Sequence, residues 1–255
     1  MTVKELYERL SERYPAAYSA EWDHDGLLCC PDPDVTVRRV LCTLDVTAAA
    51  VETAIAGDAN VILSHHPLIF HPLAAVTAQD PVGRRVIRLI GAGISHLAFH
   101  TRADAAPGGV NDLLAKAVGL DEVLTFADGL GRIGTLPASC TAEAFAAFVA
   151  KALGAPTVIL GDAGRPVRRV AVLGGSGKSE IGAAIAAGAD TFLSGRLSYE
   201  SINEARELGI NLLEAGHFYT EALLPRHLAD ELVGWGLETE YFDSCAVRVI
   251  GHNTQ

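Results

Sequence analysis

AIAGDANVILSHH (residues 54–66) aligns without a gap with AIAAGADTFLSGR (residues 184–196), 130 residues further along the chain. Each copy runs from the end of an Ala-rich helix into a short apolar strand and stops at a turn. This repeat predicts an α/β fold built from two related α/β lobes. A chance similarity between two Ala-rich units stays open as the alternative.

The rest of the chain continues the alternation of short β-branched runs with Ala-rich helical stretches. Such alternation predicts mostly parallel sheets flanked by helices. The expected strands are 40–45, 60–64, 94–99, 170–173, 191–193, 211–213 and 237–242, and the expected helices are 1–14, 48–56, 83–90, 180–187, 198–208 and 221–233. We expect the first lobe at residues 1–125 and the second at 126–255, with the boundary inside 120–136. An arrangement in which the N- and C-terminal elements pack together stays open.

The charge balance limits the partners. The 255 residues include 20 basic and 31 acidic ones, which gives a net charge of −11. An acidic surface repels phosphate backbones and anionic lipids, so nucleic acid and membranes are disfavoured. The densest basic group, Arg84, Arg85 and Arg88, is interpreted as a solvated helix face. Residues 61–79 lack Asp, Glu, Lys and Arg but include three histidines and two prolines, which is not typical of a membrane span.

The cysteines and the N-terminus indicate the compartment. The five cysteines include no C-x-x-C pair, and their scattered spacing argues against a disulfide framework and against a thiolate zinc site. The first residues, MTVKELYERLSERY, are charged throughout and predict an amphipathic helix rather than a signal peptide. We therefore expect a soluble cytoplasmic protein with reduced cysteines.

Three segments place metal-ligating side chains just past the carboxyl ends of predicted strands: SHHPLIF (64–70), FHTRADAAPGGVND (99–112) and GHFYTE (216–221). Ligands bind at that edge of open α/β sheets. We expect six groups to gather at one rim: His65, His66, His100, Asp104, His217 and Glu221. Imidazole nitrogens together with carboxylate oxygens suit zinc, manganese or iron better than calcium or magnesium.

The spacing of these residues is consistent with joint ligation. Adjacent histidines on a regular strand would point to opposite faces, so His65 and His66 must lie in a turn, which Pro67 supports. His217 and Glu221 would face the same way on a helix. Each motif alone is commoner as a turn, core or surface pair, and His24, His71, His96, His227 and His252 are interpreted as loop or structural residues. Five or six ligands exceed one tetrahedral site and match two metals with a bridging carboxylate.

One further motif imitates a phosphate-binding loop. GGSGKS (174–179) lacks the glycine that a P-loop needs at position 172, which is Val172, and Lys178 prevents a match to G-x-S-x-G. The glycines predict a tight turn with close backbone packing. The sequence contains no dinucleotide-binding fingerprint.

Four motifs along nearly the whole chain resemble one family: EWDHDGLL (21–28), LDVTAAAVETAIAGDANVILSHHPLIF (44–70), HTRADAAPGGVNDLLA (100–115) and GHFYTE (216–221). They are similar to the dinuclear-metal proteins named after the NGG-interacting factor, many of which are named GTP cyclohydrolase I type 2 homologues. The resemblance implies two divalent metal ions per chain (zinc, manganese or iron), bound by His65, His66, Asp104, His217 and Glu221. Glu221 or Asp104 would bridge them, and His100 would be a weak ligand or a proton relay.

The resemblance also implies two α/β lobes with the metal site between them, assembled as a homohexameric ring. The chain departs from the family pattern at SGRLSYE (194–200), where Arg196 replaces Asp and Glu200 replaces His. His24 replaces Asn, and Phe218 replaces Tyr. These changes leave the implied ligand set intact and alter residues near it.

Three functions remain in competition. The first is a metal-dependent hydrolase with His100 as a catalytic proton carrier, acting on an unknown small molecule: a nucleotide, a heterocyclic C–N bond or a phosphoester. The second is a metal-binding carrier or regulatory partner protein without turnover. The third, a nucleic-acid-binding ring, is disfavoured by the charge of −11.

Overall fold

The structure, a computed structural model, describes residues 1–250, so His252 lies outside the described part. Two compact units divide the chain: Met1–Gly109 with Ala222–Ser244, and Val110–Glu221 with residues 245–250. This division differs from the expected one at residue 125. The chain enters the second unit at Val110, and a C-terminal helix and strand return to the first unit.

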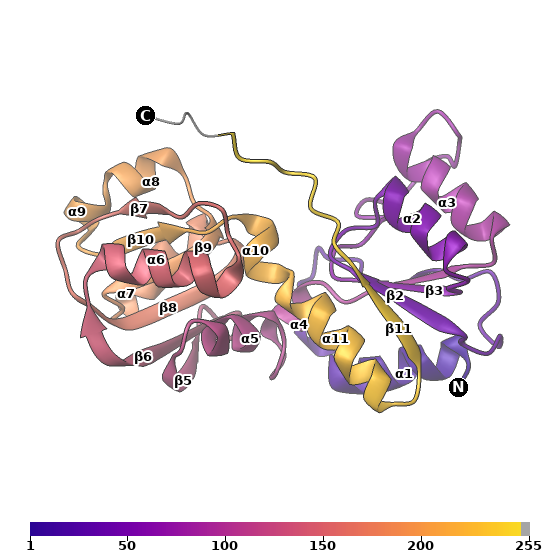
Figure 1. The fold of residues 1–255 in the computed structure, drawn as a ribbon, viewed down its shortest axis with the longest axis horizontal. Helices are drawn as coiled ribbons and strands as arrows, with labels where there is room; N and C mark the ends of the chain where they lie inside the picture. The colour runs from indigo at the N-terminus through magenta and orange to yellow at the C-terminus, as the bar shows by residue number, and fades with distance from the viewer. Residues whose placement is uncertain (251–255) are drawn as a thin grey trace. The chain divides into compact units, whose positions relative to one another are not determined.

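The first unit contains a five-stranded sheet (Figure 1). In sheet order its strands are β1 (Gly26–Cys29), β4 (Ser95–Ala98), β3 (Val61–Ser64), β2 (Arg39–Thr43) and β11 (Glu238–Phe242). Every pairing is parallel except that of β1 with β4. All four residues of β3 are buried, because helices cover both faces of a mostly parallel sheet.

Six helices belong to the first unit: α1 (Val3–Arg13), η1 (Ala16–Tyr18), α2 (Ala48–Ala56), α3 (Pro81–Gly91), α4 (Thr101–Ala105) and α11 (Leu223–Gly234). Apolar side chains of α2 and α3 pack with Leu41 and Ile62 of the sheet in one buried cluster. Thr2 begins α1 with a capping box, because its hydroxyl accepts from the Glu5 amide and the Glu5 carboxylate accepts from the Thr2 amide.

The second unit contains a six-stranded mixed sheet (Figure 1). In sheet order its strands are β5 (Asp121–Phe126), β6 (Gly131–Cys140), β8 (Val167–Ser176), β9 (Thr191–Arg196), β10 (Asn211–Glu214) and β7 (Ile159–Gly161). Only β8, β9 and β10 pair in parallel, so the expectation of mostly parallel strands holds for the centre of this sheet and not for its edges.

The helices of the second unit are α5 (Val110–Ala117), α6 (Ala142–Leu153), η2 (Lys178–Glu180), α7 (Ile181–Ala186), α8 (Tyr199–Asn203), α9 (Ala205–Leu208) and α10 (His217–Glu221). Side chains of α7 and α9 pack with Phe192 and Leu212 on one face of the sheet. None of the helices in the described part of the chain is long and apolar enough to cross a membrane. All five cysteines, each within residues 1–250, are thiols.

The repeat seen in the sequence has a matching structure in each unit. Val40 pairs with Val61 in the first unit, and Val170 pairs with Thr191 in the second, at the same offset of 130 residues. A buried polar side chain accepts the backbone amide of the preceding strand in both copies: Asn60 from Arg38 at 2.8 Å and Asp190 from Arg168 at 3.1 Å. Equivalent register and equivalent hydrogen bonds confirm two related α/β units.

Most predicted elements of these units are confirmed, and two helices differ. The helix predicted at 198–208 is two helices, because Glu204 interrupts it with a tighter turn, in which its carbonyl accepts from the Glu207 amide. The helix predicted at 221–233 begins at Leu223, after the separate helix α10. Several elements were not predicted, namely β1, β5, β6, β7, α4, α5 and α6. The hairpin of β5 and β6 begins in the stretch where only a boundary was expected and ends beyond it, at Cys140.

Candidate metal centre

The His65-His66 pair lies in a bend directly after β3, as Pro67 predicts. The backbone amides of the two residues extend the ladder by donating to the carbonyls of Thr43 at 3.3 Å and Leu44 at 3.0 Å. His65 is fully buried and His66 is partly exposed. The bend therefore turns both rings to the carboxyl edge of the first sheet.

All three histidines of the first unit's site bond an oxygen through Nδ1. The acceptors are the Phe99 carbonyl for His65 (2.8 Å), the Asp45 carboxylate for His66 (2.8 Å) and the Asp23 carboxylate for His100 (3.1 Å). Because these oxygens only accept, Nδ1 carries the proton and Nε2 carries the lone pair in each neutral ring. Metal-ligating histidines are typically oriented in this way.

The rings and one carboxylate converge. Ring centroids lie 5.1 Å apart for His65 and His66, 5.3 Å for His65 and His100, and 5.6 Å for His66 and His100. One ligand atom from each of the three lies within 4.8 Å of the others. Asp104, on α4, brings Oδ1 to 3.5 Å from His65 Nε2. This donor set fits a divalent transition metal.

Two acidic residues that the sequence reasoning left without a role hold His100 in place. The Asp23 carboxylate accepts from the His100 ring, and from the Thr101 amide at 3.1 Å and hydroxyl at 2.6 Å. Burial opposes ionisation, but the hydrogen bonds from His100 and Thr101 outweigh it and keep the pKa of Asp23 well below its usual range. Asp23 therefore orients His100 as a carboxylate.

Asp25 fixes the backbone of the same turn. Its carboxylate accepts from the His100 amide at 2.9 Å and pairs with the Arg102 guanidinium at 2.6 Å, and both side chains of the pair are buried. The signal for these acids was present in EWDHDGLL, which places Asp23 and Asp25 two residues apart just before a strand. Asp45, the partner of His66, follows β2 in the same way.

The second unit carries the other two candidate ligands on α10. His217 Nε2 lies 2.9 Å from Glu221 Oε2, one helical turn away, and Glu221 is almost fully buried. The predicted helical spacing of this pair is therefore confirmed. Of the six expected groups, four follow β3 and β4 of the first sheet, and the other two lie on α10, which follows β10 of the second sheet.

The glycines of GGSGKS allow α10 to approach β8. Gly175 has a φ of +66°, and a Cβ at this position would overlap the Glu221 carboxylate. Its amide donates to the Thr220 hydroxyl at 3.1 Å, and the Gly174 amide donates to Asn111 Oδ1 at 2.8 Å. The prediction of close backbone packing is confirmed, and these two amides already have partners.

Three of the four departures from the family pattern lie in the second unit, whereas His24 lies in the first. Arg196 ends β9 with an exposed side chain, and Glu200 is exposed on α8. Phe218 is partly buried, with its ring centroid 5.4 Å from that of Tyr219. None of the three replaces a candidate ligand.

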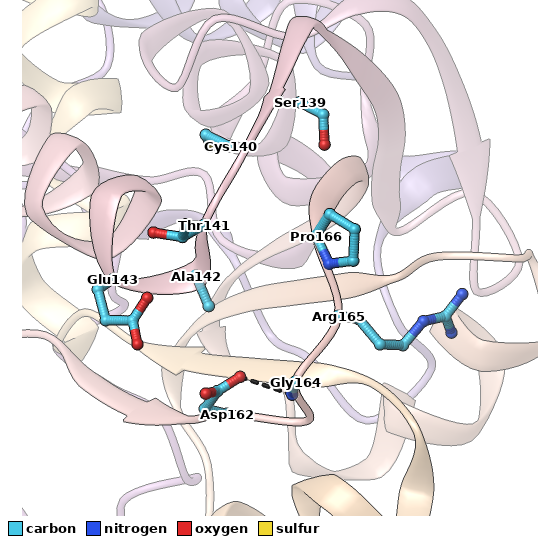
Figure 2. A pocket seen from close by; sticks show the side chains of 9 residues that line it. All are labelled: Ser139, Cys140, Thr141, Ala142, Glu143, Asp162, Gly164, Arg165 and Pro166. Carbon is cyan, nitrogen blue, oxygen red and sulfur yellow. Dashed lines mark hydrogen bonds between the residues drawn. The ribbon is translucent and has the colours of Figure 1, made fainter.

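A separate open pocket of about 450 Å³ lies at the other end of β8 (Figure 2). Its polar lining serves local structure: the Thr141 hydroxyl caps α6, the Asp162 carboxylate accepts the Gly164 amide, and the Arg165 guanidinium donates to the Gly209 carbonyl. In Figure 2 the Arg165 side chain extends away from Asp162. No residue of this pocket belongs to a potential metal cluster among residues 1–250.

The profile of one protein family, described as Duf34/NIF3 (NGG1p interacting factor 3), matches residues 1–245. The chain belongs to the Duf34/NIF3 family. The resemblance seen in the motifs is thereby confirmed over nearly the full length.

Relatives of this Duf34/NIF3 chain share a name. Two proteins called "GTP cyclohydrolase 1 type 2 homolog" are similar to it: one from Streptomyces coelicolor, 35% identical over 86% of this chain and 81% of the relative, and one from Pseudomonas aeruginosa, 32% identical over 91% and 92%. The solved structure of Staphylococcus aureus protein SA1388 is also similar, with 27% identity, a TM-score of 0.90, and coverage of 98% of this chain and 99% of the other. Reduced HcgD from Methanocaldococcus jannaschii has 26% identity, a TM-score of 0.83, and coverage of 94% and 97%.

Proposed function

We propose that this Duf34/NIF3 protein is a dinuclear metal-dependent hydrolase of a small molecule. The observation that carries the proposal is the convergence of His65, His66 and His100. In each ring Nδ1 donates a hydrogen bond to an oxygen, so Nε2 is the nitrogen with the lone pair that can bind a metal. Surface histidines have no need of such uniform orientation, whereas ligands do.

The ligand set we propose is His65, His66, Asp104, His217 and Glu221, with Glu221 or Asp104 as the bridge. Two features support it. The five proposed ligands exceed the number that one tetrahedral metal takes, and the buried Glu221 carboxylate is charge-compatible with a second cation. A bound divalent ion would supply a nucleophile at neutral pH by lowering the pKa of a coordinated water to about 7.

His100 is proposed as the group that moves a proton at its Nε2. Its Nδ1 donates to the Asp23 carboxylate, which fixes the tautomer and the orientation of the ring. Its backbone amide is held by Asp25, so the ring is positioned from two sides. A rigidly positioned histidine can accept a proton from the nucleophile and return it to a leaving nitrogen or oxygen.

A metal carrier or regulatory partner without turnover is the second candidate. The observation that favours it is that a ligand atom of His100 lies within 4.8 Å of those of His65 and His66. If all three histidines bind metal, no base remains in this cluster.

The name of the relatives, GTP cyclohydrolase 1 type 2 homolog, is the reason to test nucleotides and heterocyclic C–N bonds as substrates of the first candidate.

Elemental analysis tests the metal centre. Purified protein should hold about two transition-metal ions per chain. Glu221→Ala should lose most of both, because a bridging carboxylate serves two ions, while His71→Ala removes an exposed loop histidine and should lose none. Near-stoichiometric metal in Glu221→Ala would contradict the ligand assignment.

A turnover screen separates enzyme from carrier. Metal-loaded protein is offered nucleoside triphosphates, heterocyclic amides and phosphoesters, with zinc, manganese and iron in turn. Hydrolysis of any of them supports the first candidate, and full metal content without turnover favours the second. The same proposal includes a homohexamer, which a mass measurement in solution checks.

A further inference from the structure

Two large aromatic side chains of the first unit face water beside the histidine cluster. Trp22 is 60% exposed and Phe70 is 43% exposed. Their ring centroids lie 6.0 Å apart at an interplanar angle of 57°, although 48 residues separate them in sequence. A hydrophobic core is present next to Phe70, because the preceding residues Leu68 and Ile69 pack into it. The exposure of Phe70 is therefore not due to a missing core.

Both rings also contact His100. The Trp22 centroid lies 6.1 Å from the His100 ring at 74°, and the Phe70 centroid lies 6.0 Å from it at 72°. The His100 ring in turn lies 5.3 Å from His65 and 5.6 Å from His66. The aromatic pair is therefore continuous with the candidate ligands.

The exposed area of the pair suits a small planar ligand. A Trp or Phe side chain offers roughly 150–250 Å², so the exposed parts of both amount to about 200 Å². A stable protein interface buries about 800 Å² on each partner, which is several times more. A heteroaromatic ring of nucleobase size can stack on such an area and remain in reach of the metal ligands.

We propose that Trp22 and Phe70 form a stacking platform for the planar heteroaromatic ring of the substrate. This inference rests on the proposed function in one respect, that the ligand bound here is the one presented to the metals. The proposal requires that the substrate contain an aromatic ring, and it excludes an aliphatic substrate or one made only of sugar and phosphate. Trp22 and Phe70 are specificity-determining residues in this scheme.

The chain offers an internal reporter for the test. It has two tryptophans, Trp22 and Trp235, and Trp235 packs under the Arg9 guanidinium at 3.9 Å. In a Trp235→Phe background, fluorescence comes from Trp22 alone. Guanosine and adenosine are the probes, and ribose is the matched ligand without a ring; excitation is set beyond the absorption of the nucleosides.

We expect saturable quenching of Trp22 by at least one nucleoside and none by ribose. Phe70→Leu keeps an apolar side chain but removes the ring, and it should weaken that binding by about 5- to 100-fold. Phe148→Leu is the matched control, since Phe148 is 47% exposed in the second unit, and it should leave the affinity unchanged. In a separate control, Trp22→Phe is made in the chain that keeps Trp235. Its fluorescence comes from Trp235 alone and should not be quenched by the nucleosides.

Three outcomes overturn the platform: no quenching by either nucleoside, equal quenching by ribose, or an affinity that Phe70→Leu leaves unchanged. If the third outcome comes with a change of oligomeric mass in Phe70→Leu, the aromatic pair belongs to a protein interface. Metal content is measured on the same samples. Nucleoside stacking in protein that holds no metal would uphold the platform while the proposed function fails.

Discussion

His96 should make the stability of the protein depend on pH. It lies fully buried in β4, and its Nε2 is 2.8 Å from the Ser64 hydroxyl. That hydroxyl donates its own proton to the His66 carbonyl at 2.6 Å, so His96 donates from Nε2 to Ser64. Burial lowers the pKa of His96 from its ordinary 6.5 to about 3.

The direction and size of the effect follow from linkage. The unfolded chain takes up a proton on His96 below pH 6.5, whereas the folded chain does not do so until about pH 3. The stability that neutral His96 contributes is therefore complete above pH 6.5 and is lost as pH falls. The loss is about 1.4 kcal/mol per pH unit, or roughly 2 kcal/mol between pH 7 and pH 5.

Urea unfolding of metal-free protein across this range measures the loss. His96→Gln keeps a donor for Ser64 but cannot titrate, so its free energy of unfolding should fall by about 2 kcal/mol less than that of wild type between pH 7 and pH 5. His24→Gln removes an exposed histidine of the same unit and should retain the wild-type slope. Identical slopes for His96→Gln and wild type would refute the assignment of His96 as a buried neutral ring.

Three further variants test the site. Asp45→Ala should weaken metal binding by about 10- to 100-fold in a chelator competition, because it releases the His66 ring, while Asp58→Ala, on an exposed ion pair with Arg38, should not. Lys178→Ala should leave any affinity for nucleoside triphosphates unchanged in equilibrium dialysis, because the amides of Gly174 and Gly175 donate within the protein and offer phosphate no cradle; a large loss would restore the P-loop interpretation. His100→Ala should retain most metal and lose about 10²- to 10⁴-fold in turnover, and loss of the metal as well would make His100 a ligand.

The sequence predicted the central part of both sheets, because buried parallel strands and Ala-rich helices leave a strong pattern. Helix α2 has the predicted bounds of residues 48 and 56. The hairpin of β5 and β6 was not predicted from the sequence, because β5 is almost wholly exposed and lacks the alternation of buried and exposed residues that marks a strand. The hairpin signal was there: Asp128 and Gly129, with φ of +52° and +93°, are a dipeptide typical of hairpin turns.

The division of the chain at Val110, with the return of residues 222–244 to the first unit, has no local signal in the sequence. Local periodicity predicts helices and strands but does not indicate which sheet a terminal strand joins. β11 pairs in parallel with β2, about 200 residues earlier, and the sequence contains no short-range trace of that pairing. The candidate ligands were easier to recognise than their partners, because histidine pairs are rare whereas acids such as Asp23 and Asp45 are common on any surface.

The two copies of the repeat place their candidate ligands by different means. In the first copy the strand ends at Ser64, and the candidate ligands His65 and His66 follow it directly. In the second copy the equivalent residue to His65 is Gly195, where a Cβ would lie 2.8 Å from the Cα of His217 and 2.7 Å from the Gly175 carbonyl. A histidine cannot occupy that position without displacing α10. The missing side chain therefore allows α10 to approach β9 and Glu221 to lie buried.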